Sequence, residues 1–162
     1  MKVTFAPKGI IQIDKAERIT YKNFSGTASK YNREGDRNFA LVINDQEIAD
    51  ALIEEGWNVK IKPPREEGDA PFIYLPVKVK FNEFGPNVYL VTGGRMNRLD
   101  EESVSVLDHV YLSEIDMDIR PYDWEVNGKT GRTAYLQSGR FTQDVTDRFY
   151  AEYESKETEE AF

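Results

Sequence analysis

Apolar and polar residues alternate along much of this 162-residue chain, a pattern typical of strands that bury one face. The clearest case is 72–81, where every odd-numbered residue from Ile73 to Phe81 is apolar. Other segments rich in β-branched and aromatic residues predict strands at 18–24, 37–43, 58–62, 88–92, 114–124 and 132–141. Residues 2–5 and 10–13 are candidates for an additional N-terminal pair.

Turn-forming residues separate these segments at short intervals. Gly85-Pro86, Gly93-Gly94 and Asn127-Gly128 are examples of dipeptides that favour tight turns. Many short strands with this spacing fit a small barrel or a sandwich. The sequence therefore predicts a mainly β fold.

Two segments interrupt the strand pattern and predict short α-helices. Residues 45–56 follow an N-cap at Asn44 or Asp45 and end at Gly56, a residue that favours helix termination. Residues 99–110 predict a second helix that begins at Asp100.

The composition of the chain excludes several classes of catalytic and metal-binding site. The length corresponds to one domain, and no apolar run approaches the roughly 18 residues of a membrane span, so we expect a cytoplasmic protein. The chain has no cysteine and one histidine, His109, which excludes thiol nucleophiles, disulfides and Cys/His zinc sites. We expect no enzyme, cofactor or metal. A metal-dependent nuclease is an alternative only through Asp116 and Asp118.

Charge is unevenly distributed along the chain. The formal net charge is −8, and residues 151–162 hold five acids and one base, which leaves 24 acids and 20 bases in residues 1–150. Many of the remaining acids fall in the two predicted helices. The predicted strands are therefore balanced or locally basic, so a phosphate-binding face is compatible with the acidic total.

Basic and aromatic residues interleave on several predicted strands and turns, most densely in residues 18–39. Cations can follow the phosphates of a single-stranded nucleic acid, while aromatic rings stack on its unpaired bases. By alternation, Trp57 belongs to the core, whereas Tyr122 and Trp124 share an outer face. The candidate nucleic-acid-binding residues are Arg18, Tyr21, Lys22, Phe24, Lys30, Tyr31, Arg33, Arg37, Lys60, Lys62, Tyr74, Lys78, Lys80, Arg120, Tyr122, Trp124, Lys129, Arg132 and Tyr135.

Two parts of the sequence resemble known families. The C-terminal Glu159-Glu160-Ala161-Phe162 is similar to the acidic, aromatic-ended tails of bacterial and phage single-stranded-DNA-binding proteins. The runs YKNFSG, YNREGDRNFALVI and IRPYDWEVNGKTGRTAYL resemble a phage-encoded family of single-stranded-DNA-binding proteins with an OB-type barrel. This second resemblance spans roughly residues 18–150.

The resemblance implies an OB-like single-stranded-DNA-binding domain over residues 1–150, with extra strands and the two helices, followed by a flexible acidic tail at 151–162. It further implies sequence-independent binding in phage replication or recombination, in the host cytoplasm. In such tails the acidic residues and the terminal aromatic bind replication and recombination proteins, which here correspond to Glu157, Glu159, Glu160 and Phe162. An interaction module, such as an inhibitor or virion component with an acidic surface, is the alternative.

Overall fold

The structure is a computed structural model that describes residues 1–145. The acidic tail expected at 151–162, with Glu157, Glu159, Glu160 and Phe162, lies outside the described residues. The elements are β1 (Lys2–Phe5), η1 (Pro7–Gly9), β2 (Ile11–Asp14), β3 (Arg18–Asn23), β4 (Arg37–Val42), α1 (Gln46–Glu54), β5 (Lys60–Lys62), β6 (Phe72–Val79), β7 (Asn87–Thr92), β8 (Arg95–Leu99), η2 (Val104–Asp108), β9 (Leu112–Val126) and β10 (Lys129–Gln143).

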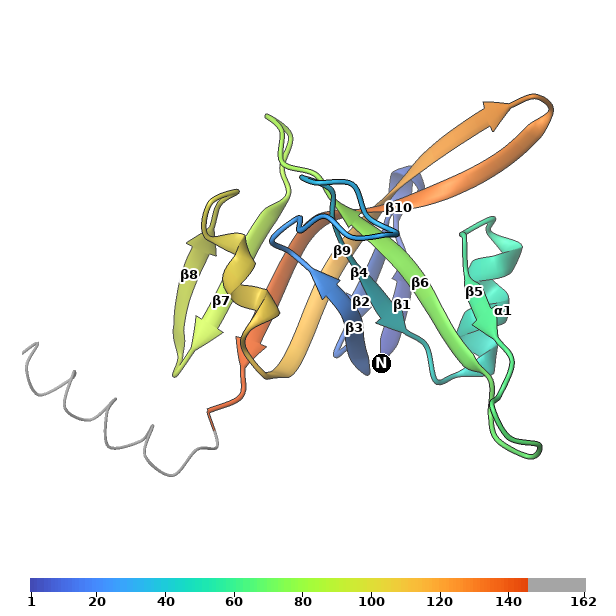
Figure 1. The fold of residues 1–162 in the computed structure, drawn as a ribbon, viewed down its shortest axis with the longest axis horizontal. Helices are drawn as coiled ribbons and strands as arrows, with labels where there is room; N and C mark the ends of the chain where they lie inside the picture. The colour runs from blue at the N-terminus through green and yellow to red at the C-terminus, as the bar shows by residue number, and fades with distance from the viewer. Residues whose placement is uncertain (146–162) are drawn as a thin grey trace, which may run out of the picture.

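The ten strands form one mixed sheet in the order β1-β2-β9-β10-β6-β4-β3 (Figure 1). β5 adds to the edge of β6, and β8 pairs with β7. The long β10 pairs in parallel with β6 at Ala134 and Tyr135, and with β7 over residues 138–142. β9 and β10 pair with each other and connect the β1–β2 strands to the strands on the other side, β6 and β7.

The sheet curves around one hydrophobic core. Ile13 of β2 and Ile19 of β3 come from near opposite ends of the strand order, yet they belong to the same buried cluster. No strand pairing closes the sheet within the described residues, because its two ends, β1 and β3, are not paired with each other. The mainly β prediction is confirmed, but a closed OB-like barrel is not observed.

Alternation predicted the inner faces of β6 and β9 correctly. Ile73, Leu75, Val77 and Val79 of β6 are buried, and the core also contains Trp57, whose side chain is 4% exposed. Burial removes these apolar side chains from water, which is the main stabilising contribution to such a fold.

The first predicted helix is confirmed as α1. Asp45 is its N-cap and accepts hydrogen bonds from the backbone N–H groups of Glu47 and Ile48. Gly56 follows the helix with a φ of 90°, which suits glycine at a helix terminus.

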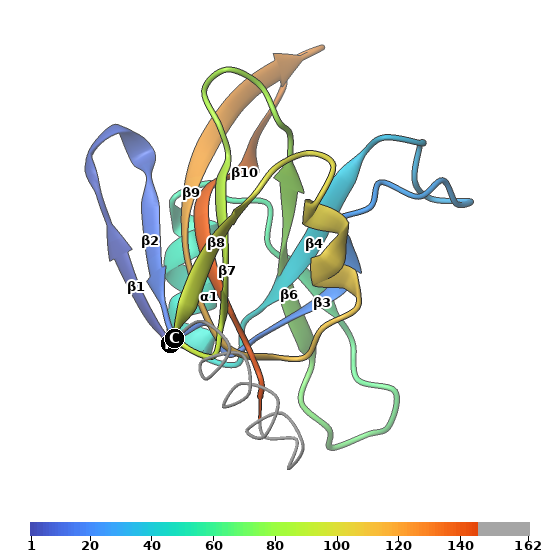
Figure 2. The same cartoon turned by 90° about the vertical axis from the view of Figure 1, so that its left-hand side faces the viewer.

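The prediction of a second α-helix over 99–110 is wrong. The Asp100 carboxylate accepts hydrogen bonds from the N–H groups of Glu102 and Ser103, which fixes a tight turn there. Only the short 3-10 helix η2 follows, and its β-branched Val104 and Val106 favour a helix weakly. η2 lies against the β3–β4 side of the sheet (Figure 2).

β8 has no counterpart among the predicted strands. Its sequence, RMNRL, does not alternate, since its two apolar residues, Met96 and Leu99, are three positions apart, and its first four residues are exposed. The turn at Gly93-Gly94, where both residues have positive φ, returns the chain along β7, with which β8 pairs.

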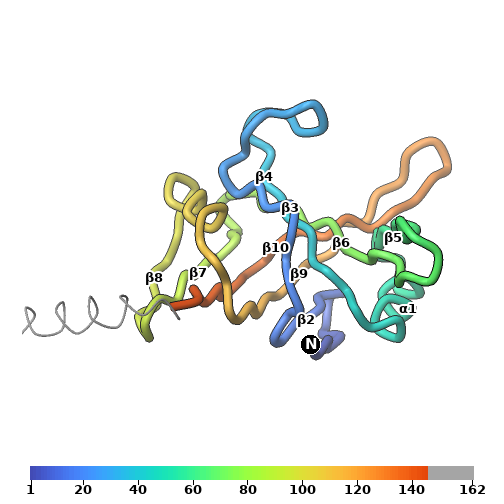
Figure 3. The backbone as a smooth tube through the Cα atoms, turned by 60° about the horizontal axis from the view of Figure 1, so that its bottom comes forward, coloured from blue at the N-terminus to red at the C-terminus, as the bar shows by residue number. Residues whose placement is uncertain are grey.

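The β3–β4 loop and the outer half of the β9–β10 hairpin both project from the body of the molecule (Figure 3). The hairpin ends in a two-residue turn at Asn127-Gly128, both with positive φ, which matches the right-handed twist of the strands.

Candidate nucleic-acid interface

A row of polar and aromatic side chains crosses the outer face of the sheet from β9 to β3. The strand registers pair Arg120 with Tyr135, Tyr135 with Lys78, Lys78 with Asn38, and Asn38 with Asn23. Directly paired residues project to the same side of a sheet. Three of the predicted binding residues, from three strands, are thereby brought together.

A groove of about 720 Å³ runs beside this row. Its lining includes residues of β4 and β6, among them Lys78, together with Lys80 directly after β6, and Tyr135 lines it from β10. The β3–β4 loop forms a wall with Tyr31 and Arg33. The groove therefore combines cations and aromatic rings from segments that are far apart in the sequence.

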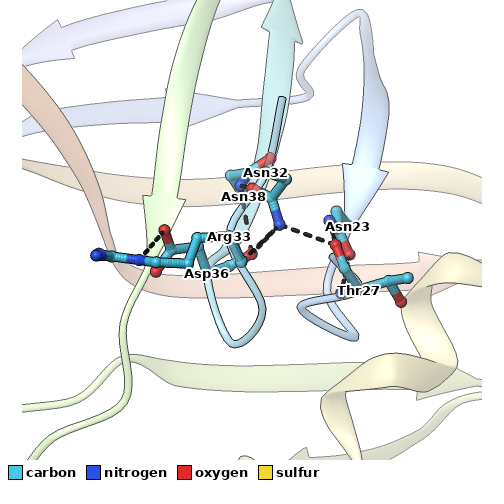
Figure 4. A network of polar contacts seen from close by, with 6 residues as sticks. All are labelled: Asn23, Thr27, Asn32, Arg33, Asp36 and Asn38. Carbon is cyan, nitrogen blue, oxygen red and sulfur yellow. Dashed lines mark hydrogen bonds and ion pairs between the residues drawn. The ribbon is translucent and has the colours of Figure 1, made fainter. Parts of the chain in front are cut away.

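Hydrogen bonds hold the β3–β4 loop in a defined shape (Figure 4). The Asn32 amide nitrogen donates to the carbonyl oxygens of Thr27, Arg33 and Asp36, and its oxygen accepts from Asn38 at 2.8 Å. A loop fixed in this way loses less entropy when a ligand binds. The exposed Tyr31 and Arg33 are thus carried on a preorganised support.

An aromatic cluster lies at the β3 end of the groove. The Tyr21 ring packs edge-on against Phe72 and Tyr74, with centroids 6.1 and 5.7 Å apart. The Lys62 ammonium donates to the Tyr21 hydroxyl at 3.1 Å and lies 5.0 Å from the centre of that ring. The hydrogen bond to Tyr21 is the main cause that raises the pKa of Lys62. Phe72 was absent from the predicted site, although the alternation that selected Tyr74 also includes it.

A second aromatic and basic cluster lies at the hairpin end. The Arg120 guanidinium lies 4.8 Å from the centre of the Tyr135 ring, and Tyr122 packs edge-on against that ring at 6.1 Å. Tyr122 is 55% exposed, so one of its faces is open to solvent. The predicted outer face of β9 is confirmed here.

Trp124 extends this surface along the hairpin. It pairs with Gly131, and a Cβ atom on Gly131 would lie only 2.3 Å from the Trp124 ring. The indole N–H donates to the Thr133 hydroxyl at 3.1 Å. Glycine at position 131 therefore lets the ring lie flat across β10.

Arg37 lies beside the groove with its charge already paired. Its guanidinium contacts a carboxylate oxygen of Glu101 at 3.3 Å, and the side chain of Arg37 is only 17% exposed. Within residues 1–145, the buried Nε of Arg37 has no hydrogen-bond partner. Both residues line the groove, so an acidic group stands at a predicted cationic position. No local sequence pattern indicated this role of Glu101.

The prediction that Phe24 lies on the exposed face is wrong. Thr20 pairs with Ala40 and Asn23 with Asn38, so β3 contains one residue more than β4 over this interval. Such a bulge, at Tyr21 with a φ of 50°, inverts the alternation beyond it. Phe24 is therefore completely buried and stacks on Phe39 at 5.3 Å.

Lys22 is also occupied by the fold. Its ammonium donates to the carbonyl oxygens of Leu107 and Val110, at 2.7 and 3.1 Å, and so ties β3 to η2. Burial is the main cause that lowers its pKa, while the Asp108 carboxylate opposes this effect. The ammonium therefore points toward η2 rather than into the groove.

Arg132 lies on the opposite face of the hairpin from Tyr122 and Trp124. It makes two contacts with the Asp123 carboxylate, the shorter at 2.7 Å, and its guanidinium lies 5.4 Å from the centre of the Trp57 ring. The hydrogen bond that Arg132 donates to the Asp123 carboxylate is the main cause that raises the pKa of Arg132. Arg132 was predicted as a binding residue on the strand across from Tyr122 and Trp124, and the strand pairing is as predicted. Its side chain, however, shares the inward alternation of Ala134 and therefore points away from the face that holds Tyr122 and Trp124.

The remaining predicted cations, Arg18, Lys30, Lys60 and Lys129, are exposed but do not line the groove. Lys30 contacts its neighbour Tyr31, with its ammonium 5.6 Å from the ring centre. Lys129 lies at the hairpin tip opposite Val126.

The acidic residues of β9 form other contacts. Asp116 pairs with Arg140 at 2.7 Å and accepts the backbone N–H of Lys15. Asp118 accepts from Ser138, and His109 caps η2. Among residues 1–145, no group of three acidic or histidine side chains is arranged to hold a metal ion. No helix of this part of the chain is long and apolar enough to cross a membrane.

Three solved structures of one phage protein resemble this fold. The single-stranded-DNA-binding protein from bacteriophage Enc34 in complex with ssDNA has a TM-score of 0.56 and 15% identity, covering 88% of this chain and 90% of that chain. The same phage protein alone has a TM-score of 0.55 and 13% identity, covering 94% and 99%. A C-terminal truncation of it has a TM-score of 0.55 and 15% identity, covering 86% and 88%. At these identities the likeness concerns the fold.

Sequence comparison identifies the family. No curated protein sequence matches the chain. The family model described as "Putative phage ssDNA-binding domain" matches residues 2–161, almost the whole length. The chain therefore belongs to the family of phage ssDNA-binding domains.

Proposed function

We propose that the chain binds single-stranded DNA along the groove between the β3–β4 loop and the β9–β10 hairpin. The observation that carries this proposal is the adjacency of Arg120, Tyr135 and Lys78 across three paired strands. Their cations can follow the phosphates while the ring stacks on an unpaired base. The solved complex of the Enc34 protein with ssDNA, on a similar fold, supports this ligand class.

Binding in such a groove is largely independent of base sequence. Stacking on tyrosine or tryptophan uses the flat face that every base has, and contacts with phosphates carry no sequence information. The role is therefore to cover unpaired DNA during phage replication or recombination in the host cytoplasm, without chemical change to the DNA. Mg²⁺-dependent strand cleavage would contradict the non-enzymatic role.

A titration of labelled oligonucleotides tests the proposal. We expect Tyr135→Ala to weaken binding to single-stranded DNA by about 1–3 kcal/mol, the range for loss of one base–aromatic stack. Lys78→Gln should reduce the steepness of the log–log salt dependence by about 0.7, the amount for one phosphate contact on a single strand.

Tyr111→Ala is the matched control. Tyr111 is 86% exposed but lines a different hollow, near β3 and β9, so its loss should leave affinity unchanged. Equal effects of Tyr135→Ala and Tyr111→Ala would exclude this groove as the interface. A chain that binds no oligonucleotide at all would favour an interaction module, such as an inhibitor or virion component.

We further propose that residues 151–162 form an acidic tail that binds a replication or recombination protein. The support is chemical: Glu157, Glu159, Glu160 and the terminal Phe162 combine negative charge with one apolar anchor. Phe162→Ala should abolish capture of that partner while leaving affinity for DNA unchanged.

A further inference from the structure

A second cleft, of about 440 Å³, adjoins the groove across a single side chain, Tyr21. It is lined by residues of β3, by the start of β6 at Phe72, and by the segment between β5 and β6, which includes Arg65. Tyr21 lines both the groove and this cleft, so the two hollows meet at its side chain.

The cleft has an excess of positive charge. Arg18, Lys62 and Arg65 line it, whereas Asp69 is its single acidic lining residue. Within residues 1–145, none of these three cations forms an ion pair. Lys62 and Arg65 are close enough for the Arg65 charge to oppose protonation of Lys62. An anion between two like charges relieves their repulsion, and a phosphate group supplies that charge.

The walls of the cleft suit a nucleotide rather than a simple ion. Phe72 and Tyr21 provide aromatic surface, and their rings are held edge-to-face. Pro63-Pro64 restricts the backbone of the opposite wall. The Tyr21 ring is fixed by its contacts with Lys62 and Tyr74, so the boundary between groove and cleft has a defined position.

We propose that this cleft is an extension of the DNA site, in which Lys62 and Arg65 bind the phosphodiester backbone of single-stranded DNA that has passed the Tyr21 ring. The proposal rests on the proposed function, because the strand reaches the cleft from the groove. It assigns a binding role to Arg65 and Phe72, which lie outside the sequence-predicted site. It also implies that short oligonucleotides fill the groove alone, while longer ones fill both.

Oligothymidylates of graded length, from about 4 to about 16 nucleotides, test this inference. We expect Arg65→Gln to leave affinity for the shortest binding oligonucleotide within twofold of the parent. Affinity for the longest should fall about fivefold or more at low salt, and its log–log salt slope should lose about 0.7. Asp69→Asn should raise affinity for long oligonucleotides only.

Lys2→Gln is the charge-matched control, because Lys2 is exposed on β1, which lines neither the groove nor the cleft. If Arg65→Gln and Lys2→Gln change the affinity equally at every oligonucleotide length, the cleft is not part of the DNA site. A loss that is the same at all lengths would also overturn it, because Arg65 would then act within the groove. A different result would contradict the proposed function itself. If DNA does not bind in the groove, Lys78→Gln should leave the affinity for the shortest oligonucleotide unchanged.

Discussion

Burial separates two aromatic residues that belong to the same basic and aromatic segment. Phe24 is enclosed by Phe39 and Phe141, whereas Tyr31 is 89% exposed at the groove wall. Phe24→Ala should lower the free energy of unfolding by about 3–5 kcal/mol, because it leaves a cavity in the core. Tyr31→Ala should change it by no more than about 0.5 kcal/mol. Urea unfolding of both variants measures the difference, and equal stabilities would contradict the bulge in β3.

The Arg37–Glu101 ion pair should lower the affinity for single-stranded DNA. DNA that approaches Arg37 must compete with the Glu101 carboxylate, and exposed ion pairs contribute about 0.2–1 kcal/mol. Glu101→Gln should therefore raise affinity for single-stranded DNA, by up to about fivefold at low salt.

Glu102→Gln removes the same charge from the neighbouring residue, which does not line the groove. Measured side by side, the Glu101 variant should gain more affinity than the Glu102 variant. Equal gains would show that only the overall charge matters.

At the scale of elements, the β9–β10 hairpin depends on glycine at position 131 for the shape of its outer surface. Gly131→Ala would place a methyl group within 2.3 Å of the Trp124 ring, so the ring must move. We expect affinity for single-stranded DNA to fall by about 1–3 kcal/mol, as for the loss of one stacking ring. Thr130→Ala, at the neighbouring exposed position, should have no effect. Unchanged affinity of Gly131→Ala would place Trp124 outside the interface.

At the scale of the whole molecule, we expect the distribution of charge to control the affinity for single-stranded DNA. Residues 151–162 carry half of the net charge of −8, and they follow a body with a basic groove. We expect deletion of 151–162 to raise affinity for single-stranded DNA at low salt, because a tethered acidic segment competes at high effective concentration. The difference should shrink as salt screens the charges. Identical affinities at low salt would show that the segment does not compete.

Period-two alternation is a local property, so the sequence by itself determined most strand positions, the inner faces of β6 and β9, and the tight turn at Asn127-Gly128. It also determined α1, because a cap and a terminating glycine are local signals. The family resemblance predicted the ligand class correctly.

Only the tertiary structure decided which side chains from different strands lie next to one another. One extra residue in β3 buried Phe24, and the register of β10 against β6 and β9 placed Tyr135 between Lys78 and Arg120. Bulges and inter-strand registers depend on contacts between distant segments, which no local pattern records. For the same reason, the pairing of Arg132 with Asp123 could be recognised only once both strands were in place.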